Sequence, residues 1–332
     1  MINPVYSPAP GRYESGIRYR RCGRSGILLP EIALGLWHNF GDVNPLANSL
    51  EMAHYAFDHG IVHFDLANNY GPSYGSAEET FGMIMRKSFA PFRDELFISS
   101  KAGYDMWPGP YGEWGSRKYL MASLDQSLKR MNLDYVDLFY SHRFDPQTPL
   151  EETMQALVDI VRAGKALYAG ISNYPPEAAA FAYQYLKDRD VPCLIYQGRY
   201  NILNREPEQA ILDQAKGNGV GFIAFSPLAQ GLLTGRYLDG IPADSRMAKE
   251  KFLKSSALTP GMQAALVKLN GIAARRGQTL AEMALAWCFK DDRVTSVIVG
   301  ASRVAQIEDD FKALENTAFS AEELSEIDAA VR

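Results

Sequence analysis

A carboxylate, a phenol and an ammonium group occur in the first third of the sequence, in an order that suits proton transfer. Asp65 ends the mainly apolar segment 61–65, Tyr70 comes five residues later, and Lys101 directly follows the segment 96–100. A free phenol, with a pKa of about 10, is a poor acid at neutral pH. A nearby cation would lower that pKa, and a carboxylate would hold the cation in place. Together the three residues predict a tyrosine that acts as a general acid.

Strands must hold these residues, because short apolar runs recur along the chain with helical patterns between them. Their spacing is mostly about 30 residues, the length of one βα unit, and eight such runs predict a closed (β/α)8 TIM barrel, an α/β fold. An open doubly wound sheet is the alternative, but the turn after the first run contains no G-x-G-x-x-G and reads Leu-Gly-Leu-Trp-His-Asn-Phe-Gly at 34–41. The eight runs are 32–36, 61–67, 96–100, 136–140, 166–171, 194–197, 220–225 and 296–299.

Three segments lie outside this repeating pattern. Residues 1–17 hold three prolines and are expected to form a flexible N-terminal arm. Residues 19–30 are typical of a β-hairpin, at the start of a single barrel domain that spans residues 18–332. The gap between the seventh and eighth strands, from 225 to 296, is too long for one unit and holds two helical patterns. A long excursion after a barrel strand is usually functional, often as a lid or a cofactor clasp.

The composition is that of an ordinary globular protein, with 332 residues of which 47% are hydrophobic and 22% charged. The formal net charge of −5 argues against a nucleic-acid surface, and no run of roughly 18 apolar residues is present to span a membrane. The start of the chain has neither the basic nor the apolar part of a secretion signal. Cys22, Cys193 and Cys288 are far apart and expected to be free thiols, so a cytoplasmic location is expected.

In a barrel, catalytic groups project from the carboxyl ends of the strands. Asp65 and Tyr70 belong to the second strand, Lys101 to the third and His142 to the fourth, so these side chains are expected to converge. Taken singly, each has an ordinary explanation: a loop-capping aspartate, a half-buried tyrosine, a solvated lysine or a core histidine. Four such groups on neighbouring strands favour an active site. Five histidines without H-E-x-x-H argue against zinc, so no metal is expected, and no G-x-S-x-G indicates a serine hydrolase.

With these four residues in order, the chain from about Tyr19 to its end resembles an aldo-keto reductase. Gly-Ile-Ser-Asn at 170–173, Phe-Ser-Pro-Leu at 225–228 and Gly-Ala-Ser-Arg at 300–303 match further signatures of that family. Within the family the chain is similar to the potassium-channel β-subunit-like branch, and above all to its bacterial L-glyceraldehyde 3-phosphate reductases. The stretches that carry this closer similarity are 34–41, 101–111 and 228–235. The resemblance implies NADPH-dependent reduction of small aldehydes, methylglyoxal among them.

The resemblance also implies a role for each of the four residues. Tyr70 would protonate the developing alkoxide, Lys101 would lower the pKa of Tyr70, and Asp65 would keep Lys101 charged and oriented. His142 would donate a hydrogen bond to the carbonyl oxygen of the substrate. Channel subunits place an asparagine at the position of His142. The histidine therefore favours an active reductase over the alternative, a regulatory NADP(H)-binding subunit with slow turnover.

A binding site for NADP(H), running from the first strand to the helix after the eighth, is a further implication. Asp309 and Asp310 lie where relatives use an acid and an amide on the adenine, and two acids near a 2′-phosphate weigh against a strict preference for NADP. The arginines of the set are as compatible with ordinary surface charge as with phosphate binding. The implied cofactor residues are Trp37, Asp65, Ser172, Asn173, Gln197, Phe225, Ser226, Leu228, Gln230, Gly231, Arg236, Arg246, Gly300, Ser302, Arg303, Gln306, Asp309 and Asp310.

Substrate selection is expected to depend on aromatic residues and arginines in the loops after the first, third and fourth strands. Aromatic side chains there, Tyr111 and Trp114 included, could shape a small pocket or could equally pack the loops together. Arg143 and Arg117 are both candidates for binding a substrate phosphate. The related branch forms tetramers or larger assemblies, so a homo-oligomer without nucleic-acid or membrane partners is expected. The implied substrate residues are Trp37, Tyr70, Tyr104, Trp107, His142 and Arg143.

Overall fold

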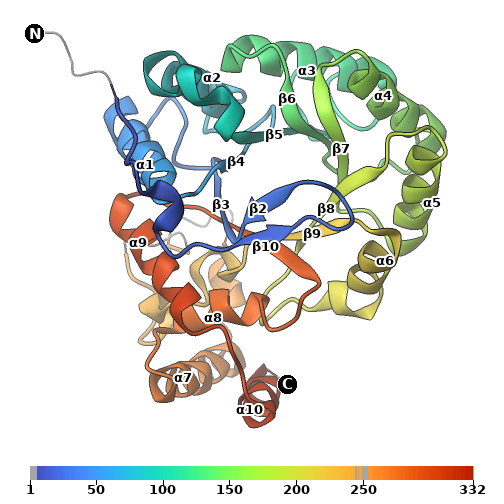
Figure 1. Cartoon of the computed structure of the whole chain (residues 1–332). Helices are drawn as coiled ribbons and strands as arrows, with labels where there is room; N and C mark the ends of the chain where they lie inside the picture. The colour runs from blue at the N-terminus through green and yellow to red at the C-terminus, as the bar shows by residue number, and fades with distance from the viewer. Residues whose placement is uncertain (1–5, 244, 246, 249–252, 332) are drawn as a thin grey trace, which may run out of the picture.

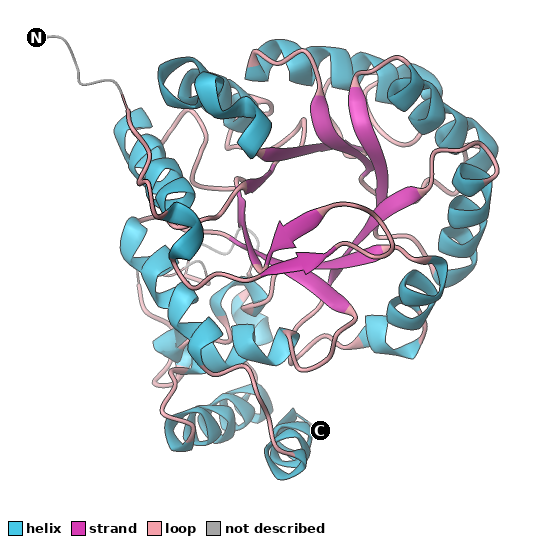
Figure 2. Ribbon diagram, viewed as in Figure 1, coloured by secondary structure: helices cyan, strands magenta, loops and turns pink. Residues whose placement is uncertain are grey.

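Eight parallel strands form a closed barrel in the computed structural model, which describes residues 6–243, 245, 247–248 and 253–331 (Figures 1 and 2). The strand order is β10-β3-β4-β5-β6-β7-β8-β9, and β10 pairs with both β3 and β9, which closes the ring. The predicted (β/α)8 TIM barrel is confirmed, and the open doubly wound sheet is wrong. The barrel strands are β3 (Ile32–Gly35), β4 (His63–Asp65), β5 (Phe97–Ala102), β6 (Val136–Ser141), β7 (Ala166–Ser172), β8 (Cys193–Arg199), β9 (Gly221–Phe225) and β10 (Val294–Val299).

Helices surround the barrel (Figure 1), and their buried apolar residues pack in one core cluster with residues of the strands. In α3, Ser116 caps the first turn by accepting a hydrogen bond from the Tyr119 N–H, and Leu120, Leu124 and Leu128 lie on the buried side. Among the described residues, none of the helices combines the length and the apolar character that crossing a bilayer requires. The α-helices are α1 (Leu46–Asp58), α2 (Ser76–Ile84), α3 (Arg117–Met131), α4 (Leu150–Arg162), α5 (Pro176–Lys187), α6 (Ile211–Asn218), α7 (Pro260–Arg275), α8 (Leu280–Cys288), α9 (Val304–Lys312) and α10 (Ala321–Val331).

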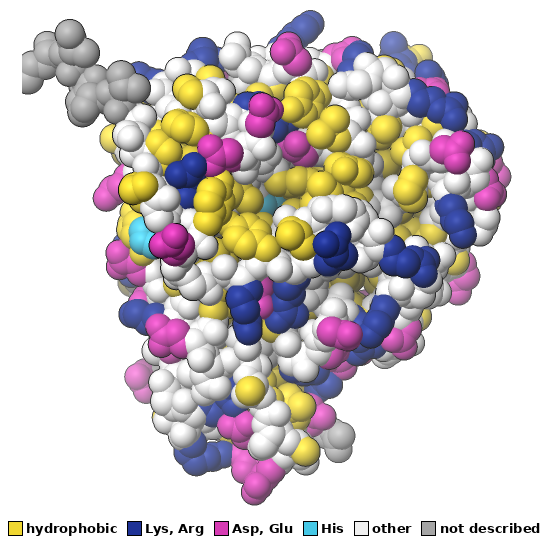
Figure 3. Space-filling model, viewed as in Figure 1, with side chains coloured by type: hydrophobic (Ala, Val, Ile, Leu, Met, Phe, Trp, Pro, Cys, Tyr) yellow, Lys and Arg dark blue, Asp and Glu magenta, His cyan; other side chains and the backbone are white. Residues whose placement is uncertain are grey.

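The predicted hairpin, β1 (Tyr19–Arg21) and β2 (Leu28–Pro30), covers the amino-terminal end of the barrel. Its turn is tied to the start of β9, because the Arg24 N–H donates to the carbonyl oxygen of Gly219 at 2.9 Å. Figure 3 views this end of the molecule, where apolar side chains gather around the middle of the face. The carboxyl ends of the strands, and with them the predicted site, therefore lie on the far side in these views.

Residues 6–17, expected to belong to a flexible arm, lie against α1 and the short 3-10 helix η3 (Ala90–Glu95). The Tyr6 ring stacks on His54 at 3.9 Å between centroids, and its hydroxyl donates to Asp58 at 2.8 Å. Arg12 forms an ion pair with Glu95. Within the described residues, this part of the chain is therefore attached to the barrel by a ring stack and by hydrogen bonds.

The long connection predicted between the seventh and eighth strands is present between β9 and β10, and it contains α7 and α8. Thr259 caps α7 by accepting from the Met262 N–H. Thr279 and Glu282 form a reciprocal capping box at the start of α8. These threonine oxygens satisfy N–H groups that a helix start leaves free, so both helices begin where the predicted patterns begin.

Alternation along β5 decides which of its side chains point into the barrel. Phe97 packs with Leu138 and Tyr140 in the apolar cluster inside the barrel. Ser99 and Lys101, two and four residues further along the strand, project to the same side. The barrel interior is thus apolar toward the hairpin and polar toward the carboxyl ends of the strands.

Gly170 in β7 makes room for the buried Tyr140 ring, because a Cβ there would lie 2.6 Å from a Tyr140 ring carbon and 3.1 Å from the Ile195 carbonyl oxygen. We expect Gly170→Ala to lower the free energy of unfolding by about 1–3 kcal/mol, the usual cost of overpacking. Gly271→Ala in α7, where nothing lies within 4 Å, is the matched control and should raise it by about 0.5–1 kcal/mol. Urea unfolding measures both changes, and an unchanged midpoint for Gly170→Ala would contradict the close packing.

Candidate active site

The Lys101 ammonium group is fully buried at the carboxyl ends of β4 and β5. Its Nζ donates to Oδ2 of Asp65 at 2.6 Å, to the carbonyl oxygen of Leu66 at 2.7 Å and to the hydroxyl oxygen of Tyr70 at 3.3 Å. Burial lowers the pKa of Lys101, and the Asp65 carboxylate acts against that shift. The structure thus brings three of the predicted residues into direct contact.

Asp65 is held in turn by side chains whose role the sequence patterns did not reveal. Its Oδ1 accepts from Ser99 Oγ at 2.8 Å and from Gln197 Nε2 at 3.1 Å. Ser99 Oγ also lies 3.0 Å from Nε2 of His63. Because the single hydroxyl hydrogen of Ser99 goes to Asp65, His63 must donate through Nε2. A signal was present, since Ser99 and Lys101, like His63 and Asp65, are two residues apart on one strand face.

Tyr70 lies on the loop after β4, with its ring centroid 4.7 Å from Nζ of Lys101. Burial raises the pKa of Tyr70 well above its usual value, and the charge of Asp65 adds to the rise. This direction is opposite to the expected lowering of the Tyr70 pKa, because the loss of water around the phenol has the largest influence on it. The phenol therefore carries its proton at neutral pH, and the raised pKa makes it a weak acid unless its phenolate is stabilised.

His142 follows β6 and lies edge-on to Tyr70 at 5.8 Å and to Tyr104 at 4.7 Å, measured between ring centroids. Burial lowers the pKa of His142 well below 6.5, and two neighbouring cations act in the same direction. The imidazole is therefore neutral at neutral pH and has one N–H to donate. Asp65, Tyr70, Lys101 and His142, called the tetrad below, lie together at one end of the barrel.

Ser172, Asn173 and Gln197 lie beside the tetrad at the ends of β7 and β8. Ser172 and Gln197 are partners in the β7–β8 register. Asn173 has a left-handed backbone, with φ of 55°, and its Nδ2 donates to Ser172 Oγ at 3.0 Å and to the carbonyl oxygen of His142 at 3.2 Å. The structure thus places these three predicted cofactor residues next to one another, with Gln197 also in contact with Asp65.

The loop after β9 has an unusual run of left-handed backbone. Values of φ of 54°, 47°, 58° and 102° occur at Ser226, Ala229, Gln230 and Gly231. Such conformations cost energy in residues other than glycine, and they cluster at functional sites. Left-handed loops can turn N–H groups to one side and bind anions. In this loop the N–H groups of Ala229 and Gly231 donate to carbonyl oxygens within the loop itself, at 2.9 and 2.8 Å. Asn201, which was not predicted, fixes the first turn by donating to the carbonyl oxygen of Ser226 at 2.9 Å. That this loop follows the pyrophosphate of a dinucleotide stays a prediction from the resemblance.

The start of α9 is tied to the first part of the barrel by two residues that were not predicted. Asn39 and Asn48 donate to carbonyl oxygens of the loop before α9, at 2.8 and 3.1 Å. Gln306 Oε1 accepts from the Ser302 N–H at 2.7 Å. Ser302 and Arg303 are exposed at the helix start, a position where backbone N–H groups favour a phosphate. That these residues bind the adenosine end of the cofactor stays a prediction.

Asp309 and Asp310 face different surroundings. Asp309 is exposed and forms an ion pair with Lys312 at 2.8 Å. Asp310 is buried, and burial together with the charge of Asp309 raises the pKa of Asp310 well above its usual value. Burial therefore favours the protonated form of Asp310, and a cation offsets the charge of Asp309. The two acids weigh less against a bound phosphate than the sequence suggests.

The remaining predicted cofactor residues are spread along the strand ends. Trp37 is 38% exposed, and its ring lies 6.2 Å from that of Tyr70. Phe225 ends β9 and is followed by Leu228 in the left-handed loop, while Gly300 directly follows β10. Arg236 is exposed in the connection after β9. Arg246 lies outside the described residues.

The predicted substrate residues divide into two groups. Trp107 packs against Tyr119 at 5.1 Å between ring centroids, which joins its loop to α3. Arg117 forms an ion pair with Asp159 on α4, so it does not point to the tetrad. Arg143 directly follows the tetrad histidine and lies over the Tyr104 ring at 4.4 Å. Of the two arginines considered for a phosphate, the structure brings only Arg143 to the site.

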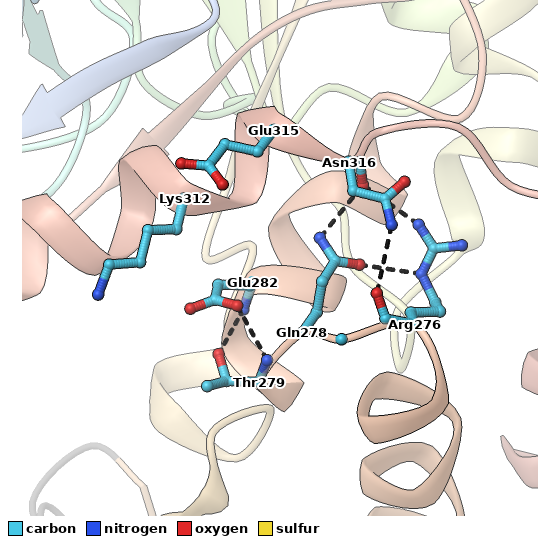
Figure 4. A pocket seen from close by; sticks show the side chains of 8 residues that line it. Arg276, Gln278, Thr279, Glu282, Lys312, Glu315 and Asn316 are labelled. Carbon is cyan, nitrogen blue, oxygen red and sulfur yellow. Dashed lines mark hydrogen bonds between the residues drawn. The ribbon is translucent and has the colours of Figure 1, made fainter.

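A surface pocket of about 420 Å³ lies elsewhere, between the α7–α8 turn and the 3-10 helix that follows α9 (Figure 4). Arg276 and Gln278 both donate to the carbonyl oxygen of Asn316, at 3.2 and 3.1 Å. Thr279 and Glu282 bond to each other in the capping box. These polar groups join the α7–α8 turn to Asn316 and cap the start of α8. Within the described ranges, no cluster of three or more His, Cys, Asp or Glu side chains is placed to hold a metal ion.

Comparison with known proteins agrees with this geometry. The family model described as "Aldo/keto reductase family" matches residues 31–332, so the chain belongs to that family. An L-glyceraldehyde 3-phosphate reductase of Escherichia coli (strain K12) is 57% identical over 329 residues, which are 98% of this chain and 95% of the relative. Probable voltage-gated potassium channel β subunits of Arabidopsis thaliana and Oryza sativa subsp. japonica are 35% and 36% identical, over 90% of this chain and 92% of each relative. The resemblance inferred from the sequence is confirmed, and the chain is an oxidoreductase of a family that uses nicotinamide dinucleotides.

His63 is fully buried, and burial lowers its pKa to about 4. An unfolded chain restores the usual histidine pKa of about 6.5, so between these values the unfolded state binds more protons and the folded state loses stability as the pH falls. From pH 7 to pH 5 we expect His63 to account for a loss of about 2 kcal/mol. His63→Gln keeps an amide donor for Ser99 and removes the titration, so urea unfolding should show a smaller loss in this variant. Equal losses in both proteins would contradict a neutral His63.

Proposed function

We propose that the protein reduces small aldehydes to alcohols with NADPH, L-glyceraldehyde 3-phosphate and methylglyoxal among them. The observation that carries this proposal is the buried contact of Lys101 with both Asp65 and Tyr70, at the end of the barrel where substrates bind. The relative that is 57% identical is described as an L-glyceraldehyde 3-phosphate reductase, which supports that substrate.

Tyr70 is the proton donor in this proposal. A reduced nicotinamide bound at the site would supply the hydride for the carbonyl carbon, and the carbonyl oxygen would take the phenolic proton of Tyr70. As the phenolate forms, the Lys101 ammonium 3.3 Å away stabilises its charge, and Asp65 keeps that ammonium in place. The neutral His142 donates its N–H to the same carbonyl oxygen and so favours the build-up of negative charge there.

The residues that would hold the cofactor follow from their placement. Ser172, Asn173 and Gln197 offer hydroxyl and amide groups to the nicotinamide carboxamide, beside the tetrad. The left-handed loop after β9 suits the pyrophosphate. Arg303 can pair with a 2′-phosphate through two N–H groups, with Ser302 beside it at the start of α9. The burial of Asp310, which raises its pKa, and the ion pair of Asp309 with Lys312 support a preference for NADPH.

A regulatory NADP(H)-binding subunit with slow turnover is the second candidate, supported by the 35% identity to a probable channel β subunit. The neutral imidazole of His142 beside Tyr70 favours the enzyme.

A cytoplasmic homo-oligomer is part of the proposal. Cys22, Cys193 and Cys288 are free and buried, a state compatible with a reducing compartment.

The wild-type protein should oxidise NADPH over many turnovers with L-glyceraldehyde 3-phosphate, followed by the loss of NADPH absorbance. Tyr70→Phe should lower kcat by about 10²–10⁴-fold, because it removes the donated proton and leaves the ring in place. NADPH binding, measured by fluorescence titration, should stay as in the wild type. Tyr13→Phe, a hydroxyl deletion on the outer side of the barrel, is the control. Wild-type turnover in Tyr70→Phe would refute the proton donor, and one slow burst in the wild type would favour the regulatory subunit.

NADPH should bind more tightly than NADH, because Arg303 and the start of α9 can hold the additional phosphate. Arg303→Gln should raise the dissociation constant of NADPH by about tenfold or more, the usual cost of losing hydrogen bonds to a charged group, with a much smaller effect on NADH. Fluorescence titrations with both cofactors measure this difference. Arg162→Gln on α4 is the matched control. Comparable affinities of the wild type for the two cofactors would refute the preference.

A further inference from the structure

The Arg143 guanidinium is held in a fixed position at the mouth of the site. Its Nε donates to the carbonyl oxygen of Gly103 at 2.8 Å, and its Nη2 donates to a carboxylate oxygen of Glu113 at 2.8 Å. Its Cζ lies 4.4 Å from the ring centroid of Tyr104 and 3.5 Å from that of Trp114. Among the described residues, Nη1 has no hydrogen-bond acceptor, so part of the donor edge remains available.

The Tyr104 ring lies between the Arg143 guanidinium and the His142 imidazole. Tyr104 contacts both sides, with its ring centroid 4.4 Å from Cζ of Arg143 and 4.7 Å from the ring of His142. The Arg143 side chain is 20% exposed, so a ligand can reach it. A three-carbon aldehyde with a terminal phosphate carries its anionic group at the opposite end from its carbonyl oxygen. A carbonyl at His142 would therefore place a phosphate near Arg143.

Glu113 already shows that the guanidinium binds an oxygen anion at this place. Its side chain is 43% exposed, and an ion pair so open to water is weak. A phosphate carries nearly two charges and three acceptor oxygens, so it can displace one carboxylate from an arginine. The backbone of the next residue, Trp114, is left-handed with φ of 73°, a costly conformation that holds its indole against the guanidinium.

We propose that Arg143 binds the phosphate group of the substrate, and that Glu113 occupies the guanidinium until the phosphate displaces it. The proposal rests on the reductase function proposed above and adds the residue pair that selects phosphorylated over unphosphorylated aldehydes. Arg143 acts as the anchor that orients the aldehyde toward His142. Glu113 competes with the phosphate and sets how strong the preference is.

Two substrates that differ only in the phosphate, L-glyceraldehyde 3-phosphate and L-glyceraldehyde, test this directly. The ratio of their kcat/KM values, with NADPH in excess, measures the preference. Arg143→Gln should lower the ratio by about 10–100-fold, and Arg143→Lys, which keeps a cation, should recover part of the loss. Glu113→Gln should raise the ratio by about two- to fivefold, because the competing charge is gone. Arg117→Gln, whose arginine pairs with Asp159, should leave the ratio as in the wild type.

Inorganic phosphate gives a readout that a purely structural role for Arg143 would not change. It should inhibit L-glyceraldehyde reduction competitively, with an inhibition constant at least about tenfold higher in Arg143→Gln. Equal losses with both substrates in Arg143→Gln and Arg143→Lys would overturn the inference, since Arg143 would then only support its loop. A wild type that reduces both substrates without preferring the phosphate would overturn this inference alone. A wild type that reduces neither would refute the proposed function and this inference with it.

Discussion

A buried ammonium group sets the conditions that the rest of the site meets. Moving a charge out of water costs several kcal/mol, and the cost is offset only when a counter-charge and hydrogen-bond acceptors surround it. Lys101 has the Asp65 carboxylate, the Leu66 carbonyl oxygen and the Tyr70 hydroxyl oxygen around it. Asp65 in turn is held by groups on β5 and β8. One charge thus fixes the relative positions of three strands and of the loop that carries Tyr70.

Burial leaves that ion pair surrounded by neutral proton donors. The pKa of Tyr70 is raised, and those of His63 and His142 are lowered, in each case chiefly by the loss of water. At neutral pH the phenol keeps its proton and both imidazoles are uncharged. A substrate carbonyl would therefore meet donors that can stabilise negative charge on its oxygen, with the Lys101 ammonium group behind them. This distribution of charge is what the reduction of a carbonyl requires.

The residues proposed to bind anions lie around the edge of the site rather than in its centre. They belong to the loop after β9 and to the start of α9, and Arg303 and Arg143 add guanidinium groups nearer the solvent. Separating phosphate binding from the buried ion pair keeps strong charges away from Lys101, whose pKa depends on its surroundings. The barrel makes this separation possible because each strand end supplies its own loop.

Local patterns in the sequence were enough for the eight strands, the two helices between the seventh and the eighth of them, and the order of the tetrad along the chain. Alternation and capping depend on residues only a few positions apart, so they can be recognised without the fold. Tertiary structure decided the support of Asp65 by Ser99, the direction of the Tyr70 pKa shift, the attachment of residues 6–17 to the barrel, and the choice of Arg143 over Arg117. Each of these depends on burial or on contact between segments distant in the chain, and a local pattern contains neither.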